Sequence, residues 1–290
     1  MIDIHMHTVY SDGDKTVEEI LKMCEERKLE YISITDHNTC KQYNDETLKN
    51  NKIFSGKIIK GTELNAVFQN RGIEILAYNI DTEIIENWCE KYYSEGELKR
   101  QEDILYKRLL NVCDKHGLIY NENNILKAKE TSKYIEGPVY FELIKYKENC
   151  EILGEFTESL NLFCRKALTN PDSSYFINHI EFKPPYKEVI DIIRKAGGKV
   201  FLAHPFEYRF EDTIKFINDL RAEGGLDGIE CFHTSSEDDG KKDMLVDYAR
   251  KNNLYISGGS DYHGILKPDI EIGVGRGGLN IVKEFVEEWI

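Results

Sequence analysis

Residues 1–14 read MIDIHMHTVYSDGD, and this stretch decides how the rest of the chain is interpreted. The apolar start predicts a buried β-strand, and His5 and His7 follow at strand spacing, so both imidazoles leave the same face. Two imidazoles on one face, with Asp12 close behind, are ligands that divalent metals bind well. An H-x-H pair alone also occurs among ordinary surface or core residues, so the other motifs of the chain decide between the two interpretations.

Short apolar runs recur along the chain and alternate with helical patterns. These runs predict buried parallel strands, because strands covered on both faces read as nearly continuous apolar segments. They lie at MIDI (1–4), YISIT (31–35), IIKGTEL (58–64), IEILAY (73–78), KVFLAH (199–204), GIECF (228–232) and YISGGSD (255–261). The alternation predicts an α/β fold, either a βα barrel or a doubly wound sheet.

Helical signals fill the gaps between these runs. Thr16 and Glu19 form a capping box before an amphipathic segment, and AGGK at 196–199 is a helix stop before a strand. Further helices are predicted at 186–196, 211–222, 241–251 and 280–289.

The middle of the chain differs in composition. From about residue 83 to residue 178 it is richer in Glu, Lys, Asn and Tyr, and LKRQEDILYKRLLNVCDKHG at 98–117 is strongly helical. We therefore divide the chain into a first α/β part at 1–82, a mostly helical insertion at 83–179 and a second α/β part at 180–290.

Charge and cysteine usage narrow the class of protein. The 290 residues include 38 Lys and Arg against 52 Asp and Glu, a formal net charge of −14, which argues against binding long duplex nucleic acid or anionic membranes. The 7 cysteines form no C-x-x-C pair, which is typical of reduced thiols and predicts a cytoplasmic protein. The first residues do not predict a signal peptide, and no apolar run reaches membrane-spanning length.

Histidines and carboxylates gather at one end of the predicted strands. Residues at, or just beyond, the carboxyl ends of strands include His5, His7, His37, His204, His263, Asp12, Asp36, Glu63 and Asp261. In βα barrels the chemistry lies at this end of the strands. Each motif alone has an ordinary interpretation as a turn, a loop or a surface carboxylate. Together, and in this order, they favour a metal cluster.

These motifs resemble those of the PHP (polymerase and histidinol phosphatase) family. The residues that carry the resemblance are D-I-H-M-H-T (3–8), S-D-G (11–13), T-D-H (35–37), G-T-E (61–63), A-H-P (203–205) and G-S-D-Y-H-G (259–264). The resemblance implies a distorted seven-stranded (β/α) barrel with two or three divalent ions, Mn, Fe or Zn. The S-D-G loop, G-I-E-C-F-H at 228–233 and the helical insertion look most like the branch that cleaves nucleotides and short oligonucleotides.

The resemblance also implies a set of metal ligands. His5, His7, Glu63 and Asp261 would bind one ion, Glu63 would bridge to a second ion shared with His204, and a third ion would be bound by Asp12, His37 and His263. Asp3 and Asp36 would orient imidazoles.

One position departs from the family pattern. Where the family usually has a histidine in the fourth strand, this chain has Glu74. As a ligand, this carboxylate would favour harder ions, and its ordinary interpretation is a simple strand carboxylate.

The substrate-binding residues are less clearly marked. In the nucleotide-cleaving branch the insertion usually opens a helix with an Arg-Pro-His-like stretch, whereas this chain has E-G-P-V-Y at 136–140. Candidates for binding the phosphate are Arg100, Arg108, Lys133 and Arg276. His233 follows a strand and could contact phosphate or protonate the leaving group; the alternative is a buried, hydrogen-bonded histidine.

We expect a metal-dependent phosphoesterase in which a hydroxide bridging two ions attacks phosphorus in line. Its substrate would be a phosphorylated small molecule, a nucleotide or a short oligonucleotide. Two alternatives stay open: a histidinol-phosphate phosphatase of the same family, and a non-catalytic PHP module that binds a partner.

Overall fold

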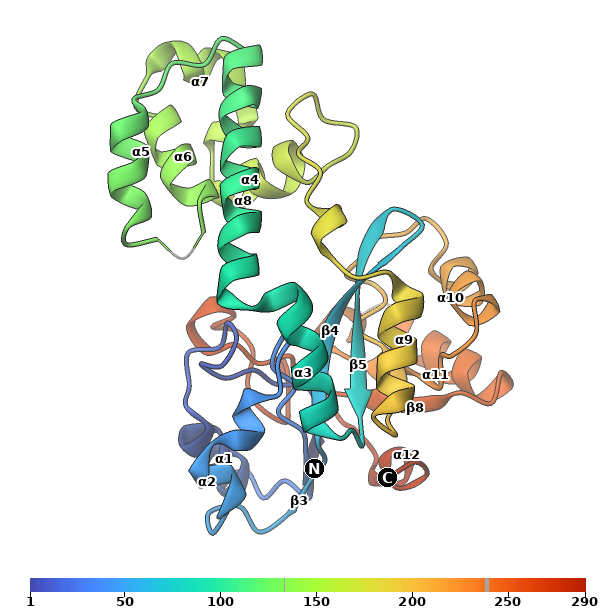
Figure 1. The fold of residues 1–290 in the computed structure, drawn as a ribbon. Coiled ribbons are helices and arrows are strands. Elements are labelled where there is room, and N and C mark those ends of the chain that lie inside the picture. The colour runs from blue at the N-terminus through green and yellow to red at the C-terminus, as the bar shows by residue number, and fades with distance from the viewer. Residues whose placement is uncertain (133, 238–239) are drawn as a thin grey trace. The chain divides into compact units, whose positions relative to one another are not determined.

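The computed structural model describes residues 1–132, 134–237 and 240–290, and Figure 1 shows their fold. The chain divides into two units, one made of Met1–Lys91 and Lys183–Ile290 and the other of Tyr92–Phe182. The first unit is α/β and the second is helical. No helix in the described residues is both long and apolar enough to cross a bilayer.

The strands of the α/β unit form two sheets. Their bounds are β1 Ile2–Asp3, β2 Tyr31–Ile32, β3 Lys57–Ile58, β4 Gly61–Phe68, β5 Arg71–Tyr78, β6 Lys199–Leu202, β7 Gly228–Phe232 and β8 Tyr255–Gly258. One sheet has the order β1-β2-β3 and the other has the order β4-β5-β6-β7-β8. Each strand falls within or beside an apolar run of the sequence, so the predicted strand positions are confirmed.

The direction of β5 corrects the prediction of an all-parallel arrangement. β5 pairs antiparallel with both β4 and β6, whereas the other pairings within the sheets are parallel. A two-residue turn at Gln69 and Asn70, both with positive φ (49° and 57°), joins β4 to β5. Two-residue turns with positive φ match the twist of a tight β-hairpin. Figure 1 shows the two strands of this hairpin, β4 and β5, as long arrows.

Isolated bridges connect the two sheets at both ends. Met6 pairs with Tyr262 beyond β1 and β8, and His37 pairs with Glu63 between the end of β2 and β4. The backbone N–H of Ile4 also donates to the carbonyl oxygen of Gly258 at 3.3 Å. The first and last strands of the unit therefore lie side by side.

Seven helices accompany the strands of the α/β unit in the described residues. Their bounds are α1 Val17–Glu26, α2 Glu46–Lys49, α3 Thr82–Tyr93, α9 Tyr186–Lys195, α10 Thr213–Ala222, α11 Lys241–Lys251 and α12 Lys283–Glu287. The predicted capping box is confirmed, since the Thr16 side chain accepts from the backbone of Glu19 and the Glu19 carboxylate accepts from the backbone of Thr16. Four of the predicted helices are confirmed as α9 to α12, although α12 is shorter than expected.

The core of this unit is aliphatic. Ile4, Ile32, Ile75 and Phe201 are fully buried between the strands and helices. Burying each such side chain contributes about 1.5–3 kcal/mol. This packing gives the strand ends a rigid base.

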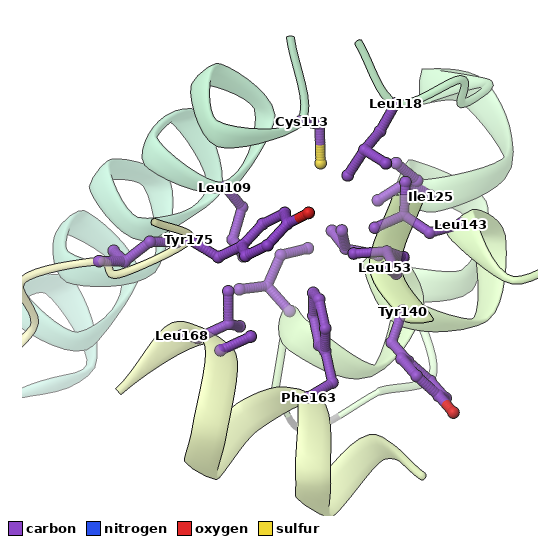
Figure 2. Close-up of a cluster of buried hydrophobic side chains, with 14 residues drawn as sticks. Leu109, Cys113, Leu118, Ile125, Tyr140, Leu143, Leu153, Phe163, Leu168 and Tyr175 are labelled. Atoms are coloured by element: carbon purple, nitrogen blue, oxygen red, sulfur yellow. The ribbon is translucent and has the colours of Figure 1, made fainter. Parts of the chain in front are cut away.

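The helical unit has a core of its own. Its helices are α4 Glu95–Lys115, α5 Glu122–Lys129, α6 Glu136–Leu143, α7 Lys147–Leu153 and α8 Leu160–Leu162. Figure 2 shows Leu109 and Cys113 of α4 facing Leu143, Phe163 and other apolar side chains from the rest of the unit. The helical periodicity predicted for residues 98–117 is confirmed by α4.

Candidate metal centre

The candidate site begins where β1 and β8 end side by side. The backbone N–H of His7 donates to the carbonyl oxygen of Tyr262 at 3.0 Å, and that of Asp261 donates to the carbonyl oxygen of His5 at 2.8 Å. Gly259 permits this approach, because a Cβ at that position would lie 2.3 Å from the Cβ of His5. The backbone thus brings the first and last motifs of the sequence together.

Glu63, on β4, lies at the centre of the site and is fully buried. Its Oε2 lies 3.1 Å from Nε2 of His5, 3.3 Å from Nε2 of His7 and 3.2 Å from Nδ1 of His37. Its Oε1 lies 2.8 Å from Nε2 of His204. Burial opposes ionisation, but the neighbouring imidazoles lower the pKa of Glu63 well below its usual range.

A second carboxylate, Asp261, faces the same group of imidazoles. Its Oδ1 lies 3.5 Å from Nε2 of His5, 3.2 Å from Nε2 of His7 and 3.3 Å from Nδ1 of His263. Asp12 completes this side of the cluster, with its Oδ1 3.2 Å from Nε2 of His263. The same Asp12 oxygen lies 3.8 Å from Nε2 of His37 and 3.9 Å from Nδ1 of His7. The side chain of Asp12 is 30 % exposed, whereas that of Glu63 is fully buried.

Glu74 reaches the site because β5 is antiparallel. The hairpin pairs Glu74, in the middle of β5, with Asn65 of β4, which lies two residues after Glu63 and on the same face. Its Oε2 lies 3.4 Å from Nε2 of His204, and its Oε1 lies 4.0 Å from Nδ1 of His37. A slip of one residue in this register would turn Glu74 to the opposite face.

The imidazoles have the unmet bonding capacity expected of metal ligands. Four buried ring nitrogens form no hydrogen bond of good geometry with the residues that the structure describes, although carboxylates lie near some of them: both nitrogens of His7, Nδ1 of His37 and Nδ1 of His204. Such groups are costly to bury unless a partner binds them. Ligand atoms lie within 4.8 Å of one another in three groups, which are His7-Asp12-His37-His263, His5-His7-Glu63-Asp261 and His37-Glu63-Glu74. The residues present therefore fit divalent cations.

Burial and charge act in opposite directions on the imidazoles. Burial favours the neutral form, but nearby carboxylates outweigh it and raise the pKa of His7 and of His204 to about 9. For His37, burial prevails and lowers the pKa. The cluster therefore attracts positive charge, either as protons or as metal ions.

Two of the predicted ligands have a strained backbone. The φ angle is 25° at His204 and 56° at Asp261, in the left-handed region that non-glycine residues rarely adopt. Strain of this kind persists where the surrounding structure enforces it and is concentrated at functional sites.

Glu230, in the middle of β7, was not predicted as a site residue. It is fully buried, accepts a hydrogen bond from the His5 ring at Nδ1 (2.8 Å) and accepts another from the backbone N–H of His204 (2.8 Å). A carboxylate at Nδ1 leaves Nε2 of His5 free to face Glu63 and Asp261. The available signal was a glutamate inside an otherwise apolar strand.

Asp3 and Asp36 have a different role from the predicted one. Asp3 accepts from the backbone N–H groups of His5, Ser260 and Gly273, and Asp36 accepts from the backbone and hydroxyl of Thr8. Asp36 also accepts from the Ser11 hydroxyl at 2.6 Å. Their described bonds are to backbone and hydroxyl groups rather than to imidazole rings, so they shape the loops that carry the ligands.

His233 is 1 % exposed and joins the cluster from the end of β7. Its Nδ1 accepts from the backbone N–H of Ser235 at 3.0 Å, so in the neutral ring the proton is on Nε2. That nitrogen lies 3.2 Å from Oδ2 of Asp261. The ring therefore donates to a carboxylate.

The cations predicted to bind phosphate lie in several parts of the chain. Arg276 pairs with Asp269 at 2.6 Å, and its guanidinium also donates to the carbonyl oxygen of Thr234, beside His233. In the helical unit, Arg100 pairs with Glu97, and Arg108 pairs with Glu181 and also donates to Asn178. Lys133 lies outside the described residues. Their roles in substrate binding stay predictions.

Comparisons with known proteins agree with the motifs. The family model of the PHP domain matches residues 3–203. The 5′-3′ exoribonuclease Rnm of Escherichia coli is 25 % identical over 284 residues, covering 93 % of this chain and 87 % of its own. The 3′,5′-nucleoside bisphosphate phosphatase of Chromobacterium violaceum is 26 % identical over 267 residues, covering 90 % of this chain and 87 % of its own.

A solved structure supports the fold. A protein of Bifidobacterium adolescentis, described as a metal-dependent phosphoesterase, superposes with a TM-score of 0.65 at 24 % identity. The superposition covers 99 % of this chain and 94 % of that one, so both chains share the fold along nearly their whole length.

Proposed function

Because this chain belongs to the PHP domain family, we propose that it is a metal-dependent phosphoesterase that hydrolyses a phosphate ester of a nucleotide or short oligonucleotide. The observation that carries the proposal is the position of Glu63, whose two oxygens face four imidazoles from three segments of the chain. A carboxylate in that position suits bridging two ions. The relatives that cleave RNA and remove phosphate from nucleoside bisphosphates support this substrate class.

The proposed cofactors are two or three divalent ions, Mn, Fe or Zn. The donor sets assigned to them are His5-His7-Glu63-Asp261, Glu63-Glu74-His204 and Asp12-His37-His263. The second set has two carboxylates and one imidazole, which favours Mn²⁺ or Fe²⁺ over Zn²⁺.

The bound ions would supply the charge that activates water and neutralises the leaving oxygen. The residues of the chain prepare for this by fixing donor atoms. Glu230 fixes the His5 ring, and His233 donates from Nε2 to Asp261. We therefore assign His233 to positioning Asp261, with contact to phosphate as the alternative role.

We also propose that the two sheets belong to one distorted seven-stranded barrel. In this arrangement β3 and β4 are two parts of one strand, separated by residues 59–60. The bridges Met6–Tyr262 and His37–Glu63 support closure, because they lie at the two places where one sheet passes to the other. A barrel would direct all these strand ends toward one centre.

The test is a metal analysis combined with a substrate panel. Purified protein should contain Mn, Fe or Zn. It should also show one of two activities: release of phosphate from a 3′,5′-bisphosphonucleoside or 5′-mononucleotide, or release of mononucleotides from short 5′-phosphorylated RNA. Chelation should abolish the activity and added Mn²⁺ should restore it. The His7→Asn variant should lose metal and activity together, whereas Lys215→Met, on the exposed face of α10, should lose neither.

Two results would redirect the proposal. Faster hydrolysis of histidinol phosphate than of every nucleotide would identify a histidinol-phosphate phosphatase. Tightly bound metal without hydrolysis of any compound in the panel would contradict the enzyme and favour a binding module.

A further inference from the structure

Asp261 has two oxygens with different surroundings. Oδ1 faces the imidazoles of His7 and His263 at 3.2 Å and 3.3 Å. Oδ2 faces Nε2 of His233 at 3.2 Å and is also paired with the ammonium group of Lys267. The carboxylate of Asp261 thus lies between the two imidazoles, on one side, and the ammonium group of Lys267, on the other.

Lys267 lies three residues after the last glycine of the G-S-D-Y-H-G motif and is bonded to it through its backbone. Its N–H donates to the carbonyl oxygen of Gly264 at 3.0 Å, which closes a short turn after His263. Its side chain is 36 % exposed, whereas that of Asp261 is 5 % exposed. The lysine therefore extends from a solvent-accessible position to a buried carboxylate.

No other Lys or Arg among the described ion pairs contacts a proposed metal ligand. Arg276 is paired with Asp269, and Lys183 donates to the side chain of Asn65 at 3.1 Å. An ammonium group has three donors, and the contact with Asp261 uses one of them. Lys267 can thus keep this contact while donating to a ligand beside the cluster.

The charge of the site requires such a donor. The proposed ligands include the carboxylates of Asp12, Glu63, Glu74 and Asp261, and Glu230 adds a fifth buried beside them. Three divalent ions would barely exceed this negative charge, so a phosphate dianion would bind to a site with almost no net positive charge. A lysine at the same position supplies the missing cation.

We propose that Lys267 binds a non-bridging oxygen of the substrate phosphate while its contact with Asp261 keeps the ammonium beside the metal cluster. This inference rests on the proposed phosphoesterase function and adds to it a phosphate-binding residue. Lys267 contacts the substrate in this proposal, so its loss acts first on the affinity for phosphate.

The experiment compares Lys267→Met, Lys267→Arg and the control Lys215→Met, which removes an exposed lysine paired with Asp219. Each protein is loaded with Mn²⁺, its metal content is measured, and inorganic phosphate is titrated into it by calorimetry. KM and kcat are then measured with the best ester of the panel. Lys267→Met should weaken phosphate binding and raise KM about 10- to 100-fold, as expected for losing a hydrogen bond to a charged group.

The controls separate phosphate binding from a structural role. Lys267→Arg should recover part of the phosphate affinity, and Lys215→Met should match the wild type. Wild-type phosphate affinity and KM in Lys267→Met would overturn the inference, as would a loss that only follows a lower metal content. Absence of phosphate binding by the Mn²⁺-loaded wild type would overturn it too.

The inference and the proposed function fail in different ways. If the wild type binds phosphate through Lys267 but hydrolyses no ester, the phosphoesterase proposal fails and the phosphate site stands. If the wild type hydrolyses nucleotides and Lys267→Met does so with unchanged KM, the enzyme stands and the role of Lys267 is rejected.

Discussion

Glu230 accepts hydrogen bonds from the ring of His5 and from the backbone of His204, so one carboxylate fixes two histidines from different strands. Its ionised form has four lone-pair sites and no proton to donate. Burial opposes ionisation, yet the charge of His5 keeps the pKa of Glu230 below its usual range. The geometry of the metal centre thus depends on a residue that is not itself among the proposed ligands.

Glu230→Gln should therefore weaken metal binding without removing a ligand. The amide NH₂ must face one of the two donors, so one of the two hydrogen bonds is lost. We expect a 10- to 100-fold lower affinity for Mn²⁺, as is usual when the partner of a ligating histidine is changed. Calorimetric titration of the metal-free protein with Mn²⁺ measures this effect.

A matched control comes from the helical unit. Glu142 is 2 % exposed and accepts from Asn121 and Tyr146, so Glu142→Gln also changes a buried, hydrogen-bonded carboxylate. It should alter the thermal unfolding temperature but leave Mn²⁺ affinity unchanged. Equal Mn²⁺ affinity in wild type and Glu230→Gln would remove the assigned role of Glu230.

The sequence could predict individual site residues where each one followed an apolar run. The structure brings together His5, His7, Glu63 and Asp261 as these motifs suggested. The motif analysis assigns no role to Glu230 within G-I-E-C-F-H, although a carboxylate in a fully buried strand needs a buried partner. Lys267 was missed because its significance depends on Asp261, six positions earlier, whose orientation only the fold determines.

At the scale of elements, the β4–β5 hairpin is the main departure from the predicted arrangement. Apolar runs indicate burial but carry no information on strand direction, so IEILAY was expected to be parallel. The turn at Gln69 and Asn70 reverses the chain after only two residues, which precludes a parallel connection. The reversal pairs Glu74 with Asn65, so its side chain lies on the same face of the hairpin as that of Glu63.

The contact between β1 and β8 gives a prediction about an element boundary. Gly259→Ala would place a Cβ 2.3 Å from Cβ and 2.4 Å from the backbone nitrogen of His5. One of the two segments must move, so we expect a loss of about 1–3 kcal/mol of stability, typical of overpacking, together with weaker Mn²⁺ binding. Denaturant unfolding and Mn²⁺ titration measure the two effects.

Gly96→Ala is the corresponding control. Gly96 lies in α4, and an added Cβ would meet no described atom within 4 Å apart from its chain neighbours and the backbone of its own helix, so alanine should be neutral or slightly stabilising because of its higher helix propensity. A Gly259→Ala protein as stable as the wild type, with equal Mn²⁺ affinity, would show that the β1–β8 contact does not constrain His5.

For the whole molecule, composition predicted a helical stretch within an α/β chain, and the structure has a helical unit at Tyr92–Phe182. The change in residue usage toward Glu, Lys and Asn is visible without any structure. The sequence does not show the exact boundary between the two units, because the boundary falls between Lys91 and Tyr92, inside the regular helix α3. The isolated bridges between the two sheets lie beyond the ends of most apolar runs, so apolar periodicity alone does not predict them.

The protonation of the whole cluster makes metal binding depend on pH. Without metal, carboxylates raise the pKa of His7 and His204 to about 9 from the ordinary 6.5, so at pH 7 these rings carry protons that a metal ion must displace. Apparent Mn²⁺ affinity should rise from pH 7 to pH 9, and binding at pH 7 should release protons from these rings and from His5, whose pKa, despite burial, the carboxylates of Glu230 and Glu63 also raise well above its usual value. Calorimetry at each pH, in buffers with different ionisation enthalpies, measures both.

The stability of the metal-free protein should follow the opposite trend. Because the folded-state pKa values of His7 and His204 are raised, their contribution is fully present below about pH 6.5 and is lost as pH rises toward 9. Thermal unfolding of the chelated protein should thus show a falling midpoint over this range. Mn²⁺ affinity that does not change between pH 7 and pH 9 would contradict the assigned protonation.

The pairing of β1 with the segment after β8 also has a consequence for biosynthesis. His5 and His7 are translated some 250 residues before Asp261 and His263, which lie beside them in the folded chain. A nascent chain can therefore expose these two imidazoles long before the carboxylate that faces them has been made. A chain that ends before Asp261 lacks the complete set of proposed ligands, so the full cluster can assemble only after this last motif has been translated.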